Sequence, residues 1–308
     1  MQAYKRGVEL TLISDISVTY FALSAYYQLI DLHKSMIEDI KKLVEYKKSE
    51  VFTGLYPAQN ILEVQQKLYA LEQDLQDLEK SYAIFSHHMI RLLGESSLDF
   101  IVVTKDFQPI ELKKLFLNIG IPSDLLRNRP DVIMAEKQLI QSGYSVKIAK
   151  ADLFPTISLL GAFGYANNTF SNWFSYPNSF WSLGPSLRWP AFKGFRYLSE
   201  LDVQKSKQKQ AIDFFQSTLL KGLEDVENCL VTFFNQEKIA KLAEGKYLAQ
   251  LKISDANLEL VRVGLKSQEF AIDQYLAKYD YKKKMILDQF NTIQALIQLY
   301  KALGGEWK

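Results

Sequence analysis

The sequence predicts a mainly α-helical protein built from long, coiled-coil-like helical hairpins, with one small two-stranded β segment. Three observations lead to this fold class. Apolar residues recur at a spacing of three and four over unusually long stretches. Two short runs with strand character lie together in the second half of the chain. The hairpin sequence also occurs twice, at a constant offset along the chain.

The helical segments keep one apolar stripe in register over many turns. Such spacing holds one helix face against a partner and is typical of coiled-coil packing. His33 lies on the first stripe and is interpreted as a packed core histidine rather than a metal ligand. The stripes comprise Leu12, Ile16, Thr19, Leu23, Tyr26, Ile30, His33, Ile37, Ile40 and Val44 in the first segment, and residues from Ile61 to Leu92 and from Ile272 to Tyr300 in two others.

A further helix is predicted from about Tyr197 to Arg262, because this stretch contains no proline and no clear turn. At ~1.5 Å per residue it would extend about 100 Å. A globular core does not need a helix of that length. A tube, a stalk or a coiled-coil bundle does.

Two runs, at about 154–166 and 180–192, are predicted to be β-strands. In the second run apolar residues alternate with Ser182, Gly184, Ser186 and Arg188, as in a strand with two different faces. Each run is long enough for a tilted membrane-spanning strand. Alternation alone leaves two alternatives open: a membrane segment, or a hairpin with one face on a protein core.

An internal repeat relates residues 52–95 to residues 262–306. Gly54 and Gly264 are 264 − 54 = 210 positions apart, and the same offset relates Glu63 to Asp273 and Gly94 to Gly304. We therefore expect three parts: 1–95, a partial first repeat; 96–121, a linker or equatorial segment; and 122–308, a complete second repeat with its hairpin at 197–303. The counterpart of the strand region would fall before Met1, which predicts an N-terminally truncated chain without a signal sequence.

Composition excludes several classes of protein. The chain has 308 residues, is 48% hydrophobic and 23% charged, and has a formal charge of +2, so nucleic acid is not an expected partner. One cysteine, Cys229, rules out an internal disulfide. No apolar run is expected to form a transmembrane helix. No nucleophile, phosphate-binding or zinc-ligand motif indicates an enzyme, and no cofactor is expected.

Four motifs resemble the TolC-type outer-membrane factor family, in particular its NodT-like RND efflux branch. They are "IPSDLLRNRPDVIMAEKQL", "AKADLFPTISLLGAFG", "SLGPSLRWPAFKG" and "LYKALGGEW". The residues that carry the match are Arg129, Pro130, Asp131, Glu136, Pro155, Gly161, Gly184, Trp189 and Gly304.

The resemblance implies a trimeric channel with a β-barrel in the bacterial outer membrane and a periplasmic tunnel of long helices. It also implies a function, the passive exit of small molecules from a tripartite efflux pump. The implied partners are two further copies of the chain, a periplasmic adaptor, an inner-membrane pump and outer-membrane lipid. The alternatives are a type I secretion channel, a non-conducting truncated fragment or, less favoured, a periplasmic adaptor.

The resemblance further implies two sites. The hairpin tips of the family meet the adaptor, and the matching residues are Val263, Gly264 and Leu265, with Thr53, Gly54 and Leu55 as their repeat counterparts. The periplasmic gate of the family carries inward-facing acids just after the tip. Asp273 matches such a position, Glu63 is its repeat equivalent, and Phe270 stands where some relatives have another acid.

Overall fold

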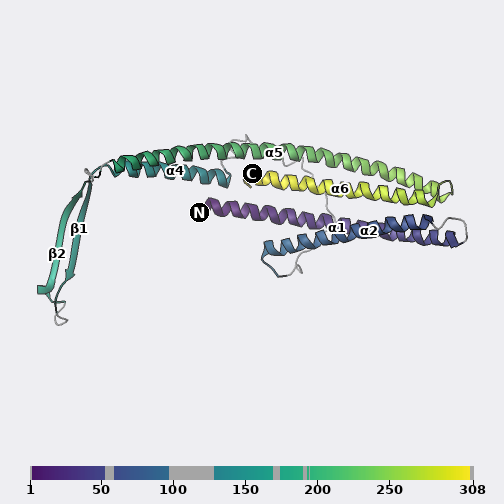
Figure 1. The fold of residues 1–308 in the computed structure, drawn as a ribbon, viewed down its shortest axis with the longest axis horizontal. Helices are drawn as coiled ribbons and strands as arrows, with labels where there is room; N and C mark the ends of the chain where they lie inside the picture. Colours follow the sequence, from purple (N-terminus) through teal and green to yellow (C-terminus); the bar gives the residue numbers. More distant parts are fainter. Residues whose placement is uncertain are drawn as a thin grey trace. The chain divides into compact units, whose positions relative to one another are not determined.

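The computed structural model describes residues 2–52, 59–96, 128–168, 174–189, 193 and 195–305 (Figure 1). The fold class predicted from the sequence is confirmed, since long helices account for most of the described chain and one small sheet accompanies them. The elements are α1 (Gln2–Phe52), α2 (Gln59–Leu93), α4 (Pro130–Ala151), β1 (Thr156–Tyr165), the short 3-10 helix η3 (Tyr176–Asn178), β2 (Ser179–Arg188), α5 (Arg196–Arg262) and α6 (Gln268–Ala302).

The chain divides into two compact units. The first combines Met1–Pro130 with Lys221–Lys308, and the second is Asp131–Leu220. Helix α5 contributes to both, because it runs through Leu220 and Lys221 without interruption. These two units are groups of residues that pack together. The three parts expected from the sequence were instead defined by the internal repeat, so the two divisions have different boundaries. The repeat-based division stays a prediction, and its linker segment lies almost wholly outside the described residues.

Helix α1 is the common packing partner of the first unit. It packs against α2 and against α6, which run beside it in Figure 1. From Thr19 onward its predicted stripe is buried except at Tyr26 and Ile30, which are partly buried, and His33 and Ile40 are completely enclosed. Leu12, at the start of the stripe, is 40% exposed. One core cluster joins Met36, Ile37, Ile40 and Val44 of α1 to Val64 and Leu71 of α2 and to Ile272 and Tyr279 of α6.

Ion pairs flank the seam between α1 and α2. Lys34 lies 2.9 Å from Glu79, and Lys41 lies 2.8 Å from Glu72. From the first pair to the second, the lysine lies seven residues later in α1 and the glutamate lies seven residues earlier in α2. This is the spacing expected for two antiparallel helices with a heptad contact. Each of these exposed pairs contributes at most about 1 kcal/mol, so the apolar seam holds the hairpin together.

Helix α6 packs along the part of α5 that belongs to the first unit. Val226 and Phe233 of α5 form a cluster with Ala295 and Leu299 of α6. Phe233 and Leu299 are fully buried. Helix α6 therefore takes part in apolar clusters with α5 and, separately, with the α1–α2 hairpin.

Helix lengths follow the repeat. Helix α1 ends at Phe52 and α5 ends at Arg262, which are 262 − 52 = 210 positions apart. Helices α2 and α6 both have 35 residues, and a glycine with positive φ follows each of them, Gly94 at 71° and Gly304 at 84°. These matches support an internal duplication of the hairpin.

Helix α1 also passes a simple test for a membrane span. A window within Gln2–Glu45 has a mean hydropathy of 1.3, so the expectation that no stretch qualifies is wrong by this measure. A core helix passes the same test, and 33% of the window is buried. Packing of α1 against α2 and α6 buries part of this apolar stretch.

Strands β1 and β2 of the second unit form an antiparallel ribbon. The register pairs Thr156 with Arg188 and continues without a bulge to Tyr165 and Ser179. Directly paired residues share a face, so the register separates two sets of side chains. One face carries Ile157, Leu159, Gly161, Phe163, Tyr165, Ser179, Trp181, Leu183, Pro185 and Leu187, and the other carries Thr156, Ser158, Leu160, Ala162, Gly164, Phe180, Ser182, Gly184, Ser186 and Arg188.

We predict that Phe233→Ala lowers the free energy of unfolding by about 3–5 kcal/mol, because it leaves a cavity in a closed cluster. Phe234→Ala is the matched control, since Phe234 is its neighbour in the sequence but is 46% exposed. The control variant should lose less than about 1 kcal/mol. Chemical denaturation of the detergent-solubilised protein measures both values. Equal losses would contradict the assignment of Phe233 to the core between α5 and α6.

Candidate functional site

The tip of the α5–α6 hairpin is a tight turn at Gly264. The Gly264 N–H donates to the Val261 carbonyl at 3.0 Å, and the Leu265 N–H donates to the Leu260 carbonyl at 2.9 Å. This pair of bonds caps the last carbonyls of α5 and requires a left-handed residue between them. Gly264 has φ 80°, which glycine adopts without the strain of a Cβ atom.

The turn presents apolar side chains to the outside. Val263 is 57% exposed and Leu265 is 72% exposed. Immediately after them, the Ser267 side chain accepts a hydrogen bond from the Phe270 N–H at 3.3 Å and starts α6. The tip is therefore fixed on both sides by caps. Its predicted counterparts Thr53, Gly54 and Leu55 lie outside the described residues.

Asp273 lies in the second turn of α6 and pairs with a lysine of the other hairpin. Lys67 Nζ of α2 lies 2.7 Å from Asp273 Oδ1. Both side chains are about half exposed, at 45% and 58%. The ion pair is thus a contact between the two hairpins near the end of the first unit that carries the Gly264 turn.

The other predicted gate residues lie close by in sequence and structure. Glu63 is an exposed residue of α2, one helical turn before Lys67. Phe270 is partly buried on α6, and Lys266 Nζ lies 4.9 Å from the centre of its ring. Acidic, basic and aromatic groups therefore share this region, and the basic group is the one that the sequence did not predict.

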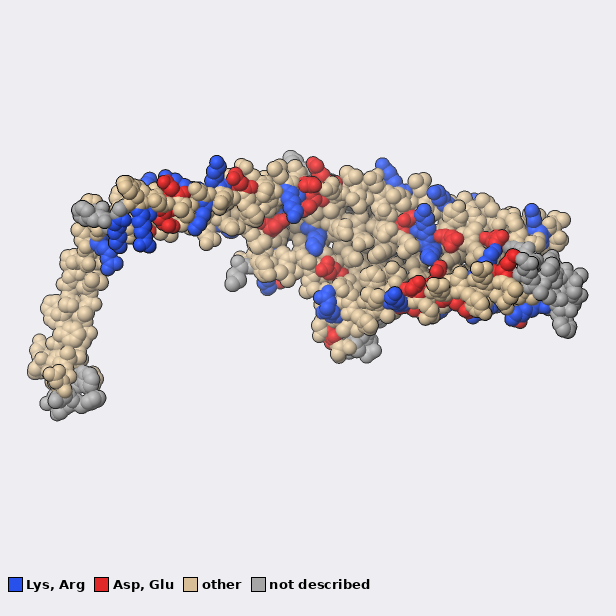
Figure 2. Space-filling view, in the orientation of Figure 1, with Lys and Arg blue, Asp and Glu red and all other residues tan. Residues whose placement is uncertain are grey.

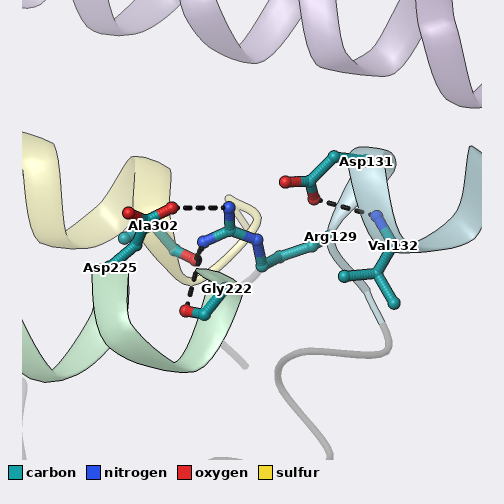
Figure 3. A network of polar contacts seen from close by, with 6 residues as sticks. All are labelled: Arg129, Asp131, Val132, Gly222, Asp225 and Ala302. Carbon is teal, nitrogen blue, oxygen red and sulfur yellow. Dashed lines mark hydrogen bonds and ion pairs between the residues drawn. The ribbon is translucent and has the colours of Figure 1, made fainter. Parts of the chain in front are cut away.

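Arg129 lies at the centre of a second constellation, drawn in Figure 3. It is 9% exposed, and its guanidinium donates to the Ala302 carbonyl at 3.0 Å and to Asp225 Oδ2 at 3.0 Å. A longer bond of 3.5 Å reaches the Gly222 carbonyl. One side chain thereby caps the last turn of α6 and attaches it to the middle of α5.

Gly304 packs directly beneath the same arginine. It has φ 84°, and a Cβ at this position would lie 3.2 Å from the Asn128 carbonyl carbon and 3.3 Å from the Arg129 backbone nitrogen. Both the backbone conformation and the close approach require glycine here. Two of the motif residues, far apart in the sequence, thus form one joint.

The remaining motif residues serve local geometry. Asp131 Oδ1 accepts a hydrogen bond from the Val132 N–H at 2.9 Å in the first turn of α4, which begins at the buried Pro130. Gly161 faces Leu183 across the ribbon, where a Cβ would meet the leucine side chain at 3.3 Å. The exposed motif residues are Glu136, Pro155, Gly184 (partly) and Trp189.

The β1–β2 ribbon exposes its apolar face. Ile157, Phe163 and Trp181 are 79%, 73% and 77% exposed. The sequence contains no Lys, Arg, Asp or Glu from Leu153 to Leu187. Figure 2 accordingly shows almost no charge along the ribbon, whereas charged residues are scattered over the helices.

Titratable groups do not form a metal site in the described part of the chain. Across residues 2–52, 59–96, 128–168 and 174–305 with the gaps noted above, no group of three or more His, Cys, Asp or Glu side chains is placed to hold an ion.

Comparison with known proteins identifies the family. The model of the outer membrane efflux protein family matches residues 121–305, which is more than half of the chain. The chain belongs to the outer membrane efflux protein family. Members of this family are efflux proteins of the outer membrane rather than enzymes.

Relatives match almost the whole length of this chain. The solvent efflux pump outer membrane protein SrpC of Pseudomonas putida is 25% identical over 322 residues, covering 98% of this chain. Nodulation protein T of Rhizobium leguminosarum bv. trifolii is 24% identical and covers 96% of it. The chain spans only 64% and 62% of the lengths of these two relatives.

Solved structures share the fold. The outer-membrane channel OprN superposes with a TM-score of 0.86 at 22% sequence identity, covering 99% of this chain and 68% of that one. A similarity at this level of identity concerns the fold.

The sequence did not indicate two side chains that form ion pairs with predicted residues, Lys67 with Asp273 and Asp225 with Arg129. Lys67 and Asp225 are ordinary charged residues on helix surfaces, and neither belongs to a motif. Their roles depend on which helices meet, which apolar spacing does not determine. Their only signal in the sequence is a charge opposite to Asp273 and to Arg129, and many other residues share that signal.

We predict that Arg129→Met costs about 2–3 kcal/mol of stability, because the Ala302 carbonyl and Asp225 lose a charged donor. Arg129→Lys should recover only part of the lost stability, since a lysine ammonium group lacks the planar, two-nitrogen geometry with which the guanidinium reaches both acceptors. Arg262→Met is the control, because Arg262 forms an exposed ion pair with Glu259 at 2.8 Å. It should change stability by less than about 0.5 kcal/mol. Similar denaturation curves for Arg129→Met and Arg262→Met would refute the role of Arg129.

Proposed function

We propose that this protein is a component of the outer-membrane exit channel of a tripartite efflux pump, and acts as a passive conduit for small molecules. Membership of the efflux family, the long hairpins and the exposed β ribbon support this function. The proposal includes an outer-membrane location with a periplasmic helical tunnel. It also includes a homotrimer, a periplasmic adaptor and an inner-membrane pump as partners. Neither catalysis nor a cofactor belongs to this role.

One observation carries the proposal: the amphipathic face of the β1–β2 ribbon. Both strands have ten residues, which is the length of a tilted strand that crosses a bilayer. One face carries the large apolar side chains and the other carries mainly small and polar ones. In a barrel wall the first face would contact lipid and the second would line the lumen.

The ribbon also indicates why several chains are needed. Within the described residues β1 and β2 pair only with each other, so each strand has one edge without a partner. Backbone N–H and C=O groups in lipid must be hydrogen-bonded, and only a closed barrel achieves this for strands. Strands from further copies of the protein supply the missing partners in the proposed trimer.

The tip at Val263, Gly264 and Leu265 is the proposed contact with the adaptor. Two exposed apolar side chains on a rigidly capped turn form a small, well-defined contact surface. Thr53, Gly54 and Leu55 are proposed as the equivalent contact of the other hairpin.

The region of Asp273 is the proposed periplasmic gate, together with Glu63 and Phe270. In a trimer each acid recurs three times, and a ring of carboxylates attracts cations. The Lys67–Asp273 pair adds a contact that joins the hairpins while the entrance is closed. Its loss should favour separation of the hairpins.

We predict that Leu265→Asp weakens adaptor binding ten- to hundredfold, because burying one leucine contributes about 1.5–3 kcal/mol. Gly264→Pro should act similarly, since proline lacks the N–H and cannot adopt a positive φ. Leu248→Asp is the control, because Leu248 is an exposed leucine of α5 away from the tip. Photo-crosslinking from positions 265 and 248 to the adaptor provides the measurement. Crosslinks at 248 without crosslinks at 265 would exclude this tip as the contact.

Planar-bilayer recording of protein purified from outer membranes tests both the channel and its gate. Lys67→Met and Asp273→Asn should each raise the resting open fraction by about 1.5- to 5-fold, the equivalent of a half-exposed ion pair. They should change ion selectivity in opposite directions. Lys67→Met leaves Asp273 uncompensated and raises cation preference, whereas Asp273→Asn lowers it.

Lys241→Met provides the matched control for this measurement. Lys241 pairs with Glu237 at 2.6 Å within α5 and joins no second helix. Its conductance should equal that of the unmodified protein. A protein without any conductance would refute the proposed channel. Conductance that is unchanged in Lys67→Met and Asp273→Asn would refute the gate alone.

A further inference from the structure

A buried histidine joins three helices of the first unit. His33 of α1 is fully enclosed, and both of its ring nitrogens are engaged. Nε2 lies 2.7 Å from the Leu71 carbonyl oxygen of α2. Nδ1 contacts the Tyr279 hydroxyl of α6, and the two rings meet edge to face with centroids 4.8 Å apart.

The partners determine where the proton of the ring lies. A carbonyl oxygen only accepts, so Nε2 must carry hydrogen and donate to Leu71. In a neutral imidazole the other nitrogen then has a lone pair, and Nδ1 accepts from the Tyr279 hydroxyl. The Tyr279 hydroxyl hydrogen has this acceptor only while His33 is neutral.

Protonation reverses one of these contacts. An imidazolium carries hydrogen on both nitrogens, so Nδ1 can no longer accept from Tyr279. The hydroxyl must turn its own hydrogen away, inside a cluster that also contains Ile37, Ile40 and Ile272. The added charge also stays inside this cluster, because none of the His33 surface reaches solvent.

The surrounding charges are divided. Burial lowers the pKa of His33, and the positive charge of Lys283 on α6 acts in the same direction. The hydrogen bond to the Leu71 carbonyl, followed by the charges of Asp74 on α2 and Asp280 on α6, acts against burial and raises the pKa of His33. Lys283 Nζ lies 3.9 Å from Asp74 and 5.9 Å from the centre of the Tyr279 ring. Because Lys283 and Asp74 pair with each other, their opposite effects on the His33 ring partly cancel. Burial also raises the pKa of Tyr279, which keeps the hydroxyl protonated.

We propose that His33 is an acid-sensitive joint, which holds the α1–α2 hairpin to α6 while neutral and loosens this attachment when protonated. The link that reverses, His33 to Tyr279, is the one between the hairpins. The link to Leu71 lies within the α1–α2 hairpin and survives protonation. Acid should therefore separate α6 from the α1–α2 hairpin before it separates α1 from α2.

The expected pH dependence has a definite sign. The unfolded chain binds a proton at His33 near pH 6.5, and the folded chain binds it only at a lower pH. The unfolded state thus holds more protons between these two values. Stability from this site is complete above about pH 6.5 and falls as the pH drops toward the lowered pKa.

NMR titration of the histidine rings in the unmodified protein is the first test. The chain has three histidines, and Gln variants of His87 and His88 complete the assignment. His33 should titrate below the ordinary histidine value of about 6.5 and keep its Nε2–H tautomer. Titration of His33 at or above that value would overturn the proposal.

A matched pair of variants tests the consequence. Gln at position 33 can still donate to the Leu71 carbonyl but cannot titrate. The melting temperature of the unmodified protein should fall between about pH 7.5 and 5, and His33→Gln should lose most of this fall. His87→Gln should retain it. An equal fall in all three proteins would overturn the proposal.

Distances between the hairpins show whether the joint opens. Spin labels at position 62 of α2 and position 253 of α5 both replace exposed residues, and Cys229→Ser removes the native thiol. Acid should shift the distance distribution to larger values in the unmodified background and leave it unchanged with His33→Gln. An identical response in both backgrounds, or none in either, would refute the joint.

Discussion

Burial of one apolar stripe of α1 between α2 and α6 is the constraint on which the first unit depends. Neither hairpin alone covers this stripe, because α1 contacts one helix of its own hairpin and one of the other. Ile40 and Leu29 reach complete burial only with both partners present. The relative position of the hairpins follows from this requirement. So does the meeting of Lys67 with Asp273 at one end of the unit.

Two buried polar side chains make this packing specific. Heptad seams tolerate a slip by one repeat, since leucine and isoleucine replace each other at similar cost. Arg129 and His33 do not tolerate it, because each has several fixed partners on different helices. A slip would leave a buried guanidinium or imidazole without hydrogen bonds. Specific register, rather than added stability, is the contribution that we infer for both groups.

The β ribbon follows a different physical rule from the helices. The helices of the first unit bury apolar stripes against one another, and charged residues are spread over the outer faces of the helices (Figure 2). The ribbon exposes Ile157, Phe163 and Trp181 and carries no charge from Leu153 to Leu187. Such a surface suits surroundings that are themselves apolar on one side. Membership of an outer-membrane efflux family and the shape of this segment therefore lead to the same interpretation.

The sequence by itself determined the length of α5, the approximate positions of both strands and the burial of His33, and it predicted the hairpin repeat, because these depend on local periodicity and on turn-forming glycines. It also determined the family, through motifs around Arg129 and Gly304. Only the tertiary structure decided that Arg129 reaches Asp225 and Ala302, that Lys67 pairs with Asp273, and that His33 contacts Tyr279. Periodicity specifies which face of a helix is buried. It does not specify which helix covers that face, and each of these contacts joins residues whose proximity depends on that choice.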